Sequence, residues 1–487
     1  MSRSDPSSTR RAPAGTIPRA HRRRRAFLKR SLGSALLGAG AGAVGTKLGL
    51  VGSALAQGGG YAALGDYKAL VCVFLYGGSD SFNLFLPEDR TLAGAYAASR
   101  GALALDPART LAPEAGGVRF SDRLPELAAL YDARRLAVVG NVGNLVVPVT
   151  RAGLDAGTAS IPTDLFAHNH QQEQWQKGWS SRPAALVGAG WGGRMADLLA
   201  DANAGSALPP TFSLAGANHF QPGNATAPVA VNPIHGPRPM YFMDPSVGGT
   251  RNAARAGAME RILALPRDNA LERFAGRAYE RALDSSQHLA GVLAANPASG
   301  DPSFGAGSGK LGAQLRTVAR LIGGRDALSQ KRQIFFVGLG GWDTHDAQGV
   351  RLDRLAGELD AGLAAFQREL DRLGVADAVT TFTASDFGRT LTVNGDGSDH
   401  GWGGHYLVMG GAVAGGQFVG RWPSYAIGGG DDAGDKGRVI PSMSVNQYGA
   451  ALARWLGLSE GDVREVFPDL ANFDDGWTTG HGLFGRV

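Results

Sequence analysis

The stretch that decides the fold runs from Ala69 to Tyr76, reads ALVCVFLY, and is followed by the polar turn Gly77-Gly78-Ser79-Asp80-Ser81. Eight consecutive apolar or aromatic residues have the length of a strand and show no amphipathic period. The run therefore predicts a strand that is buried on both faces. Strands of this kind are typical of parallel sheets whose two faces are covered by helices.

Three further apolar runs have the length of a strand, and each follows a segment with helical periodicity. The runs are 136–140, 333–339 and 378–383, and the helical segments before them are 121–133, 311–322 and 352–373. This alternation predicts an α/β fold with a mostly parallel sheet flanked by helices. Residues 204–250 interrupt the pattern with Pro, Gly and Asn, so we expect an irregular cap or insertion there.

The composition excludes several classes of protein. Of the 487 residues, 44% are hydrophobic, which gives the chain enough apolar surface to fold and excludes a largely disordered protein. Cys72 is the sole cysteine, so neither a disulfide framework nor a Cys-rich zinc site can form within the chain.

The first 56 residues carry the basic excess of the chain. They contain 11 Lys and Arg against one acid, which leaves 37 Lys and Arg against 42 Asp and Glu in the rest, a net charge of −5. A body with this balance lacks the basic surface of a nucleic-acid-binding protein, so we expect no nucleic-acid partner.

These 56 residues are also predicted to be an export signal. Residues 24–28 read RRAFL, and an apolar, Gly-rich run over 32–51 and the small-x-small sequence 54–56 follow. This order is typical of a cleavable signal, and the paired arginines resemble the twin-arginine type. A transmembrane anchor is the alternative, but the glycines lower the hydrophobicity and helix propensity of the run. We expect cleavage after Ala56, a single domain over 57–487, no stable membrane anchor, a periplasmic or secreted location, and the twin-arginine translocase as a partner during export.

Polar side chains follow several predicted strands at their carboxyl ends, where open α/β sheets bind ligands. Mixed Asp and His donors suit Zn²⁺, Mn²⁺ or Fe, and the Asp-rich spacing leaves Ca²⁺ open. The alternative is that these residues are caps and turn formers, since Asp, Gly and Ser are common in turns. The predicted metal ligands are Asp343, His345, Asp386, Asp399, His400 and His405.

Two further residues are candidates for a catalytic role. His168 begins a polar, helix-like segment, which is either a wall of the site, with His168 as acid, base or ligand, or a solvated helix face with Trp175 buried. Arg389 follows Asp386 and either clamps an anionic oxygen or pairs with a neighbouring acid.

Two motifs favour other functions only weakly. Residues 188–193 (GAGWGG) fit a dinucleotide-binding pattern, but 182–185 make a poor buried strand before them. Residues 77–81 approach the nucleophile elbow of the α/β-hydrolases, with Ser81 where glycine is required.

Six strings, taken together, resemble the DUF1501 family of twin-arginine-exported bacterial proteins, from about 66 to 485: LVCVFLYGGSDSFNLFLP, FAHNHQQEQWQKGW, GWGGRMADLL, GGWDTHDAQ, TASDFGRT and DHGWGGHYLVMGG. The resemblance implies a fold similar to the alkaline phosphatase and sulfatase superfamily, whose members hydrolyse phosphate or sulfate esters with metal ions at strand ends. It also implies that Asp80, Asp343, His345 and Asp386 are metal ligands.

The sequence departs from the patterns of the family and the superfamily at two positions. Phe387 stands where the superfamily has a histidine, for which His400 or His405 is the substitute. Ala167 stands where family members commonly carry serine, so a covalent mechanism would need Thr163, Ser160 or Ser79, and otherwise water attacks with the help of the metal. Two hypotheses remain: a metal-dependent hydrolase acting on a small anionic ester, and a non-catalytic exported binding protein on the same fold.

Overall fold

The computed structural model describes residues 60–181, 188–237, 245–265, 269–297, 304–473 and 482–484. The predicted signal over 1–56 lies outside these residues. The chain divides into two units, 1–60 and 61–487, and nearly all described residues belong to the second. Among the described helices, none is both long and apolar enough to cross a membrane.

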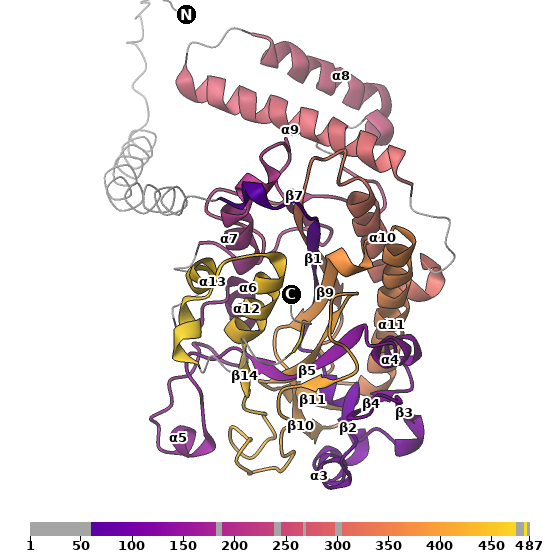
Figure 1. Cartoon of the computed structure of the whole chain (residues 1–487), viewed down its shortest axis with the longest axis vertical. Coiled ribbons are helices and arrows are strands. Elements are labelled where there is room, and N and C mark those ends of the chain that lie inside the picture. The colour runs from indigo at the N-terminus through magenta and orange to yellow at the C-terminus, as the bar shows by residue number, and fades with distance from the viewer. Residues whose placement is uncertain are drawn as a thin grey trace, which may run out of the picture. The chain divides into compact units, whose positions relative to one another are not determined.

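A nine-stranded sheet forms the centre of the second unit (Figure 1). β1 (Lys68–Tyr76) lies in the middle and pairs in parallel with β8 on one side and β9 on the other. β12 runs antiparallel between β9 and β5, which makes the sheet mixed. The order is β13-β5-β12-β9-β1-β8-β6-β7, and β14 also pairs with β5. The other strands are β5 (Leu136–Gly143), β6 (Thr211–Ser213), β7 (Val229–Ala230), β8 (Arg332–Gly340), β9 (Val379–Ser385), β12 (Gly404–Met409), β13 (Phe418–Val419) and β14 (Met443–Ser444).

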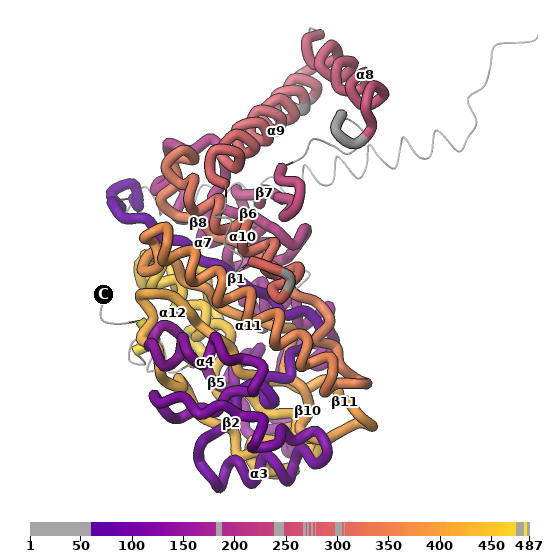
Figure 2. Tube along the Cα trace, turned by 90° about the vertical axis from the view of Figure 1, so that its right-hand side faces the viewer, coloured from indigo at the N-terminus to yellow at the C-terminus, as the bar shows by residue number. Residues whose placement is uncertain are grey.

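Both faces of the sheet are covered by helices, as the uninterrupted apolar run of β1 requires. Val71 and Val73 point into one hydrophobic cluster, together with side chains of α4, α10 and α11, whereas Cys72 and Phe74 point into a second cluster with α6, α7, α12 and α13. α10 and α11 lie side by side along the first face (Figure 2). The predicted α/β fold with a mostly parallel, helix-flanked sheet is thus confirmed.

The described helices vary from one turn to seven. They are α3 (Arg90–Arg100), α4 (Pro125–Asp132), α5 (Arg151–Asp155), α6 (His168–Lys177), α7 (Trp191–Leu198), α8 (Pro245–Leu263), α9 (Ala270–Ala295), α10 (Gly309–Gly323), α11 (Gln348–Arg372), α12 (Val445–Leu456) and α13 (Glu460–Val466).

The irregular stretch predicted over 204–250 belongs partly to the sheet. Its described part contributes β6 and β7, which extend the sheet beyond β8, and α8 begins within it. These strands therefore lie at the edge of the sheet and not over it. Residues 238–244 fall outside the described part of the chain.

Two smaller sheets lie outside the main one. β10 (Arg389–Asn394) and β11 (Gly397–His400) form an antiparallel hairpin directly after β9, with Arg389 opposite His400. β2 (Phe85–Pro87), β4 (Val118–Ser121) and β3 (Thr110–Leu111) form the other. The hairpin matters for function because it places two of the candidate site residues beside each other.

Candidate metal centre

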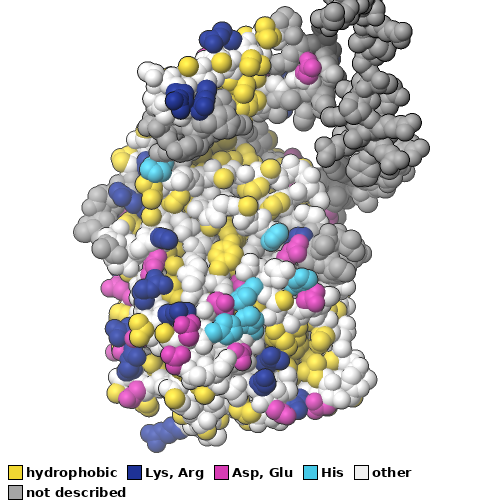
Figure 3. All heavy atoms as spheres, turned by 180° about the vertical axis from the view of Figure 1, so that it is seen from behind, with side chains coloured by type: hydrophobic (Ala, Val, Ile, Leu, Met, Phe, Trp, Pro, Cys, Tyr) yellow, Lys and Arg dark blue, Asp and Glu magenta, His cyan; other side chains and the backbone are white. Residues whose placement is uncertain are grey.

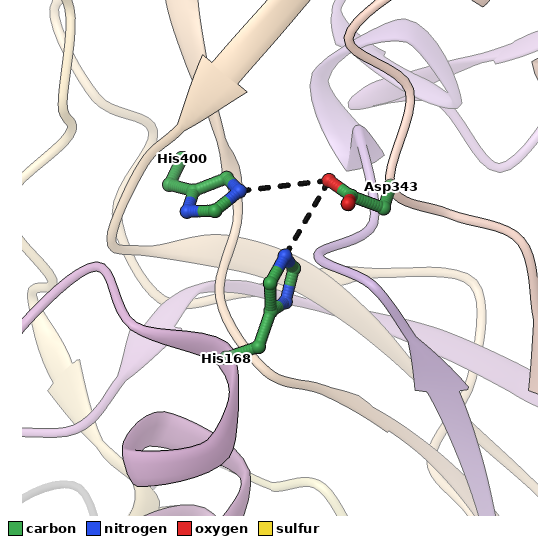
Figure 4. A group of neighbouring side chains, drawn as sticks. All are labelled: His168, Asp343 and His400. Carbon is green, nitrogen blue, oxygen red and sulfur yellow. Dashed lines mark ion pairs between the residues drawn. The ribbon is translucent and has the colours of Figure 1, made fainter.

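Three segments that are far apart in sequence meet at the carboxyl ends of β8 and β9. Asp343 lies in the turn after β8, His168 is the first residue of α6, and His400 ends β11. Their side chains point toward one another (Figure 4). Oδ1 of Asp343 lies 3.4 Å from Nε2 of His168 and 3.5 Å from Nε2 of His400. These three residues form a group in which each offers a ligand atom to a common centre.

His345 approaches the same group from the turn that carries Asp343. Its Nε2 lies 3.1 Å from Oδ1 of Asp343 and 3.0 Å from Nε2 of His400. Four potential ligand atoms therefore converge: three imidazole nitrogens and one carboxylate oxygen. We call these four residues the metal centre.

The far nitrogen of each imidazole faces an acceptor. Nδ1 of His168 lies 2.7 Å from Oδ2 of Asp386, and Nδ1 of His400 lies 2.7 Å from the carbonyl oxygen of Phe166. Nδ1 of His345 lies 3.3 Å from Oδ1 of Asp399. An acceptor opposite Nδ1 favours the neutral tautomer that carries its proton on that nitrogen and its lone pair on Nε2.

The spacing of these atoms fits a divalent ion. With metal–ligand bonds of about 2.0–2.1 Å in a tetrahedral arrangement, neighbouring ligand atoms lie about 3.3 Å apart. Four of the six separations among these atoms are 3.0–3.5 Å, and the ligand atoms of His168, Asp343 and His400 all lie within 4.8 Å of one another. Nε2 of His168 is also buried without a hydrogen-bond partner among the described residues. Lone pairs that face one another so closely repel unless a proton or a metal ion lies between them, and nitrogen-rich donors suit Zn²⁺ better than Ca²⁺.

Arg389 holds the carboxylate of the metal centre. Its side chain is fully buried, and Nη2 donates to Oδ1 of Asp343 at 2.5 Å and to the carbonyl oxygen of Trp342 at 3.1 Å. Nε donates to the carbonyl oxygen of Gly78 and Nη1 to that of Ser398, both at 3.1 Å. Burial raises the pKa of Asp343, but the hydrogen bond and charge of Arg389 outweigh this effect and lower that pKa overall. Arg389 is thus a positioning residue that keeps Asp343 ionised.

The histidines differ in their electrostatic surroundings. The hydrogen bond that His168 donates to Asp386 raises the pKa of His168, although partial burial opposes it. Burial lowers the pKa of His400, although its hydrogen bond to Phe166 opposes this. A cation therefore displaces a proton more readily from His400 than from His168.

Asp386 and Asp399 each contact a histidine of the metal centre but do not belong to the centre. Asp386 is fully buried, and its Oδ2 also accepts from Nε2 of Gln172 at 2.8 Å and from the backbone N–H of Gly77 at 3.2 Å. The sequence predicts both carboxylates as direct ligands, whereas each faces the distal nitrogen of an imidazole. Such partners orient the ring and raise its basicity.

Asp80 and His405, also predicted as ligands, do not join the group. Asp80 is buried in an ion pair with Arg100, and its Oδ2 accepts from Nε2 of Gln348 at 2.5 Å. His405 lies in β12, where Nδ1 accepts from the backbone N–H of Asn141 at 3.0 Å. Burial lowers the pKa of His405 to about 3, so the ring is a neutral core residue.

Phe387 packs against two imidazole rings of the metal centre. Its ring lies 4.8 Å from that of His168 and 4.7 Å from that of His400. The ring needs a glycine opposite it, because a Cβ on Gly78 would lie 2.4 Å from the ring, and Gly78 has a φ of +82°. Of the two histidines offered as substitutes, His400 lies in the metal centre.

A family model described as "Protein of unknown function (DUF1501)" matches residues 67–433. The chain belongs to the DUF1501 family. No curated protein matches the sequence. The solved structures similar to it include one titled "Crystal structure of Ps i-CgsB in complex with k-i-k-neocarrahexaose", at 10% identity and a TM-score of 0.32, with 82% of this chain and 74% of that chain covered.

The metal centre of this DUF1501 protein opens to the surface. The side chains of Asp343 and His345 are 46% and 42% exposed, whereas those of His168 and His400 are 28% and 24% exposed. Figure 3 shows histidine side chains gathered with acidic ones on one face. A site that solvent reaches can hold an ion and still admit a further ligand, which is the property of catalytic metal sites.

Proposed function

We propose that this protein is an exported, metal-dependent hydrolase of phosphate or sulfate esters. The observation that carries the proposal is the convergence of Nε2 of His168, His345 and His400 on Oδ1 of Asp343, with the group open to solvent. The choice of ester is supported by the resemblance of residues 385–388 (SDFG) to the alkaline phosphatase and sulfatase superfamily. Export is supported by residues 24–56.

A divalent ion in such a centre polarises an ester oxygen and lowers the pKa of an attacking water. The chain supplies the support: Asp386 and the carbonyl of Phe166 hold two imidazoles with Nε2 toward the centre, and Arg389 holds Asp343 ionised. Ala167 precedes His168 at the start of α6 and has no hydroxyl. We therefore propose direct attack by water, without a covalent intermediate on this residue.

Ala167 and Phe387 also favour a second candidate function, a non-catalytic binding protein that keeps the metal. Both replace groups that take part in the chemistry of the superfamily the chain resembles. Under this alternative, the ion would recognise an anionic ligand without turnover.

Metal analysis of the purified, exported protein separates these functions from a protein without a metal centre. We expect about one divalent ion per chain in the wild type, and loss of it in His168→Ala. The matched control is His170→Ala on the same helix, because His170 pairs with Asp164 at 2.6 Å, outside the metal centre. An ion that stays in His168→Ala, or a wild type without metal after incubation with Zn²⁺ or Mn²⁺, would overturn the proposal.

Turnover is then measured with chromogenic phosphate and sulfate esters. We expect hydrolysis that chelation abolishes, added metal restores, His168→Ala lacks and His170→Ala retains. Bound metal with no turnover on either class of ester would favour the binding protein.

A further inference from the structure

Arg438 lies directly beside the metal centre, in the loop between β13 and β14. Its guanidinium carbon lies 4.0 Å from the ring centroid of Phe166, and Nε donates to the backbone carbonyl of His400 at 3.3 Å. Phe166 in turn accepts the Nδ1 proton of His400 through its own carbonyl. Arg438 thus touches a metal ligand and the residue that orients this ligand.

The backbone of Arg438 is fixed by a buried carboxylate. Asp432 accepts from the backbone N–H of Arg438 at 3.0 Å with Oδ1, and from those of Gly428 and Gly437 at 2.9 Å with Oδ2. The carbonyl of Arg438 accepts from the N–H of Ala433 at 2.9 Å. These bonds order the backbone of the loop before any ligand arrives. Little conformational entropy of the loop is therefore lost when a ligand binds to Arg438.

The residue beneath the guanidinium has a strained backbone. Phe166 has a φ of +77°, a conformation that bulky residues rarely adopt and that clusters at functional sites. This conformation accompanies a dual use of Phe166, whose carbonyl binds His400 while its ring stacks under Arg438. The aromatic face holds the cation and leaves the edge of the guanidinium available.

We propose that Arg438 binds an anionic oxygen of the substrate beside the metal centre and so selects negatively charged esters. The inference rests on the proposed function and names the group that recognises the charge. Arg389, predicted from the sequence as the anion clamp, uses Nε, Nη1 and Nη2 on protein acceptors. Arg438, in contrast, forms no ion pair among the residues that the structure describes, and its Nη groups donate to none of their atoms.

The surroundings agree with this role. Figure 3 shows Lys or Arg side chains on the same face as the grouped histidines. With a divalent ion bound in the metal centre, this half-buried guanidinium would be the second positively charged group near an anion, and its planar donors match a phosphate or sulfate group. A neutral ester of similar size would meet the same metal but gain nothing from the arginine.

The test measures anion binding, separately from turnover. Protein loaded with Zn²⁺ is titrated with inorganic phosphate and with sulfate by calorimetry, for the wild type, Arg438→Gln and Lys436→Gln. Lys436 is the matched control because it lies on the same loop and carries the same charge, and its side chain has no ion pair in the described part of the chain. We expect Arg438→Gln to keep its Zn²⁺ affinity and to bind phosphate at least about tenfold more weakly, as for loss of a charge-assisted hydrogen bond. Lys436→Gln should change phosphate affinity by less than about threefold.

Each other outcome overturns the inference and tells its failure apart from that of the proposed function. Equal phosphate affinity in the wild type and Arg438→Gln, or equal losses in both variants, removes the role of Arg438 and leaves the metal centre standing. A metal-loaded wild type that binds neither phosphate nor sulfate also removes the role of Arg438 and leaves the metal centre standing. Loss of Zn²⁺ in Arg438→Gln shows that the arginine only supports His400. A wild type without metal removes the proposed function, and the inference with it.

Discussion

In the proposed metal centre, Asp386 contacts the distal nitrogen of an imidazole and does not join the group of ligand atoms. Its Oδ2 accepts hydrogen bonds from Nδ1 of His168, the side-chain amide of Gln172 and the backbone N–H of Gly77. Three donors on one oxygen fix the start of α6 against the end of β9. The charge of that oxygen also makes the imidazole of His168 a stronger donor to a metal.

Replacing Asp386 with Asn is therefore expected to weaken the affinity for Zn²⁺ by about 10- to 100-fold, the range for second-layer partners of metal ligands. The amide oxygen can accept the same bonds, so the fold should persist while the negative charge is lost. Competition with a chromogenic chelator measures the affinity. The control is Asp399→Asn, since Asp399 is 40% exposed and lies 3.3 Å from His345, and should cost less. Equal effects of the two variants would contradict the special role of Asp386.

Residue by residue, the sequence indicates which side chains lie at strand ends but not which partner neutralises each one. Asp343, His345 and His400 meet in the metal centre, together with His168, which the sequence suggests as an acid, base or ligand in a wall of the site. Asp80 also follows a strand, yet Arg100 from α3 pairs with it in the interior. No spacing rule pairs two residues of separate elements. The roles of the Phe166 carbonyl and of Arg438 leave no signal in the sequence at all, because one is a backbone group and the other depends on stacking.

At the scale of elements, apolar runs predict where strands lie but not which way they run. The runs at β1, β5, β8 and β9 all appear as strands of the sheet. β12 was missed, and it enters the sheet antiparallel between β9 and β5. A strand buried on both faces has the same composition in either direction, so only the β10–β11 hairpin before it decides the reversal. That reversal carries His405 into the core and away from His400.

The contact between α4 and α11 contains a carboxyl group whose protonation changes with pH. Asp360 of α11 accepts from the backbone N–H of Leu127 at 2.8 Å and of Glu126 at 3.4 Å, in the first turn of α4. Burial raises the pKa of Asp360 to about 6, although these two bonds oppose it. The folded chain thus takes up a proton at a higher pH than the unfolded chain, whose Asp pKa is about 3.9.

The contribution of Asp360 to the free energy of unfolding is greatest below pH 4. It falls as the pH rises through 6, by up to about 3 kcal/mol. Asp360→Asn keeps an acceptor for α4 and removes the charge, so this slope should disappear. Urea unfolding at pH 4.5 and pH 7.5 measures it, with the wild type and variant compared at each pH. The same slope in both proteins would show that Asp360 stays ionised or solvated in the fold.

At the scale of the whole molecule, the ligands of the metal centre come from three parts of the unit that spans 61–487. They lie at 168, 343–345 and 400, all within the stretch that matches the family model, 67–433. The sheet brings them together because β8 and β9 flank β1 in parallel and so end at one edge.

The charge of the chain is divided between its first 56 residues, which are basic, and the remainder, which is acidic. The proposal of twin-arginine export predicts that Arg24 and Arg25 act through their guanidinium groups and not through charge alone. In a bacterium that has the twin-arginine translocase, Arg24→Lys with Arg25→Lys should leave the protein in the cytoplasm as its full-length precursor. The matched control, Arg22→Lys with Arg23→Lys, makes the same change two residues earlier and should be exported normally. Fractionation, with mass spectrometry of the mature N-terminus, measures both. Normal export of the first variant would assign the leader to another route or to a membrane anchor.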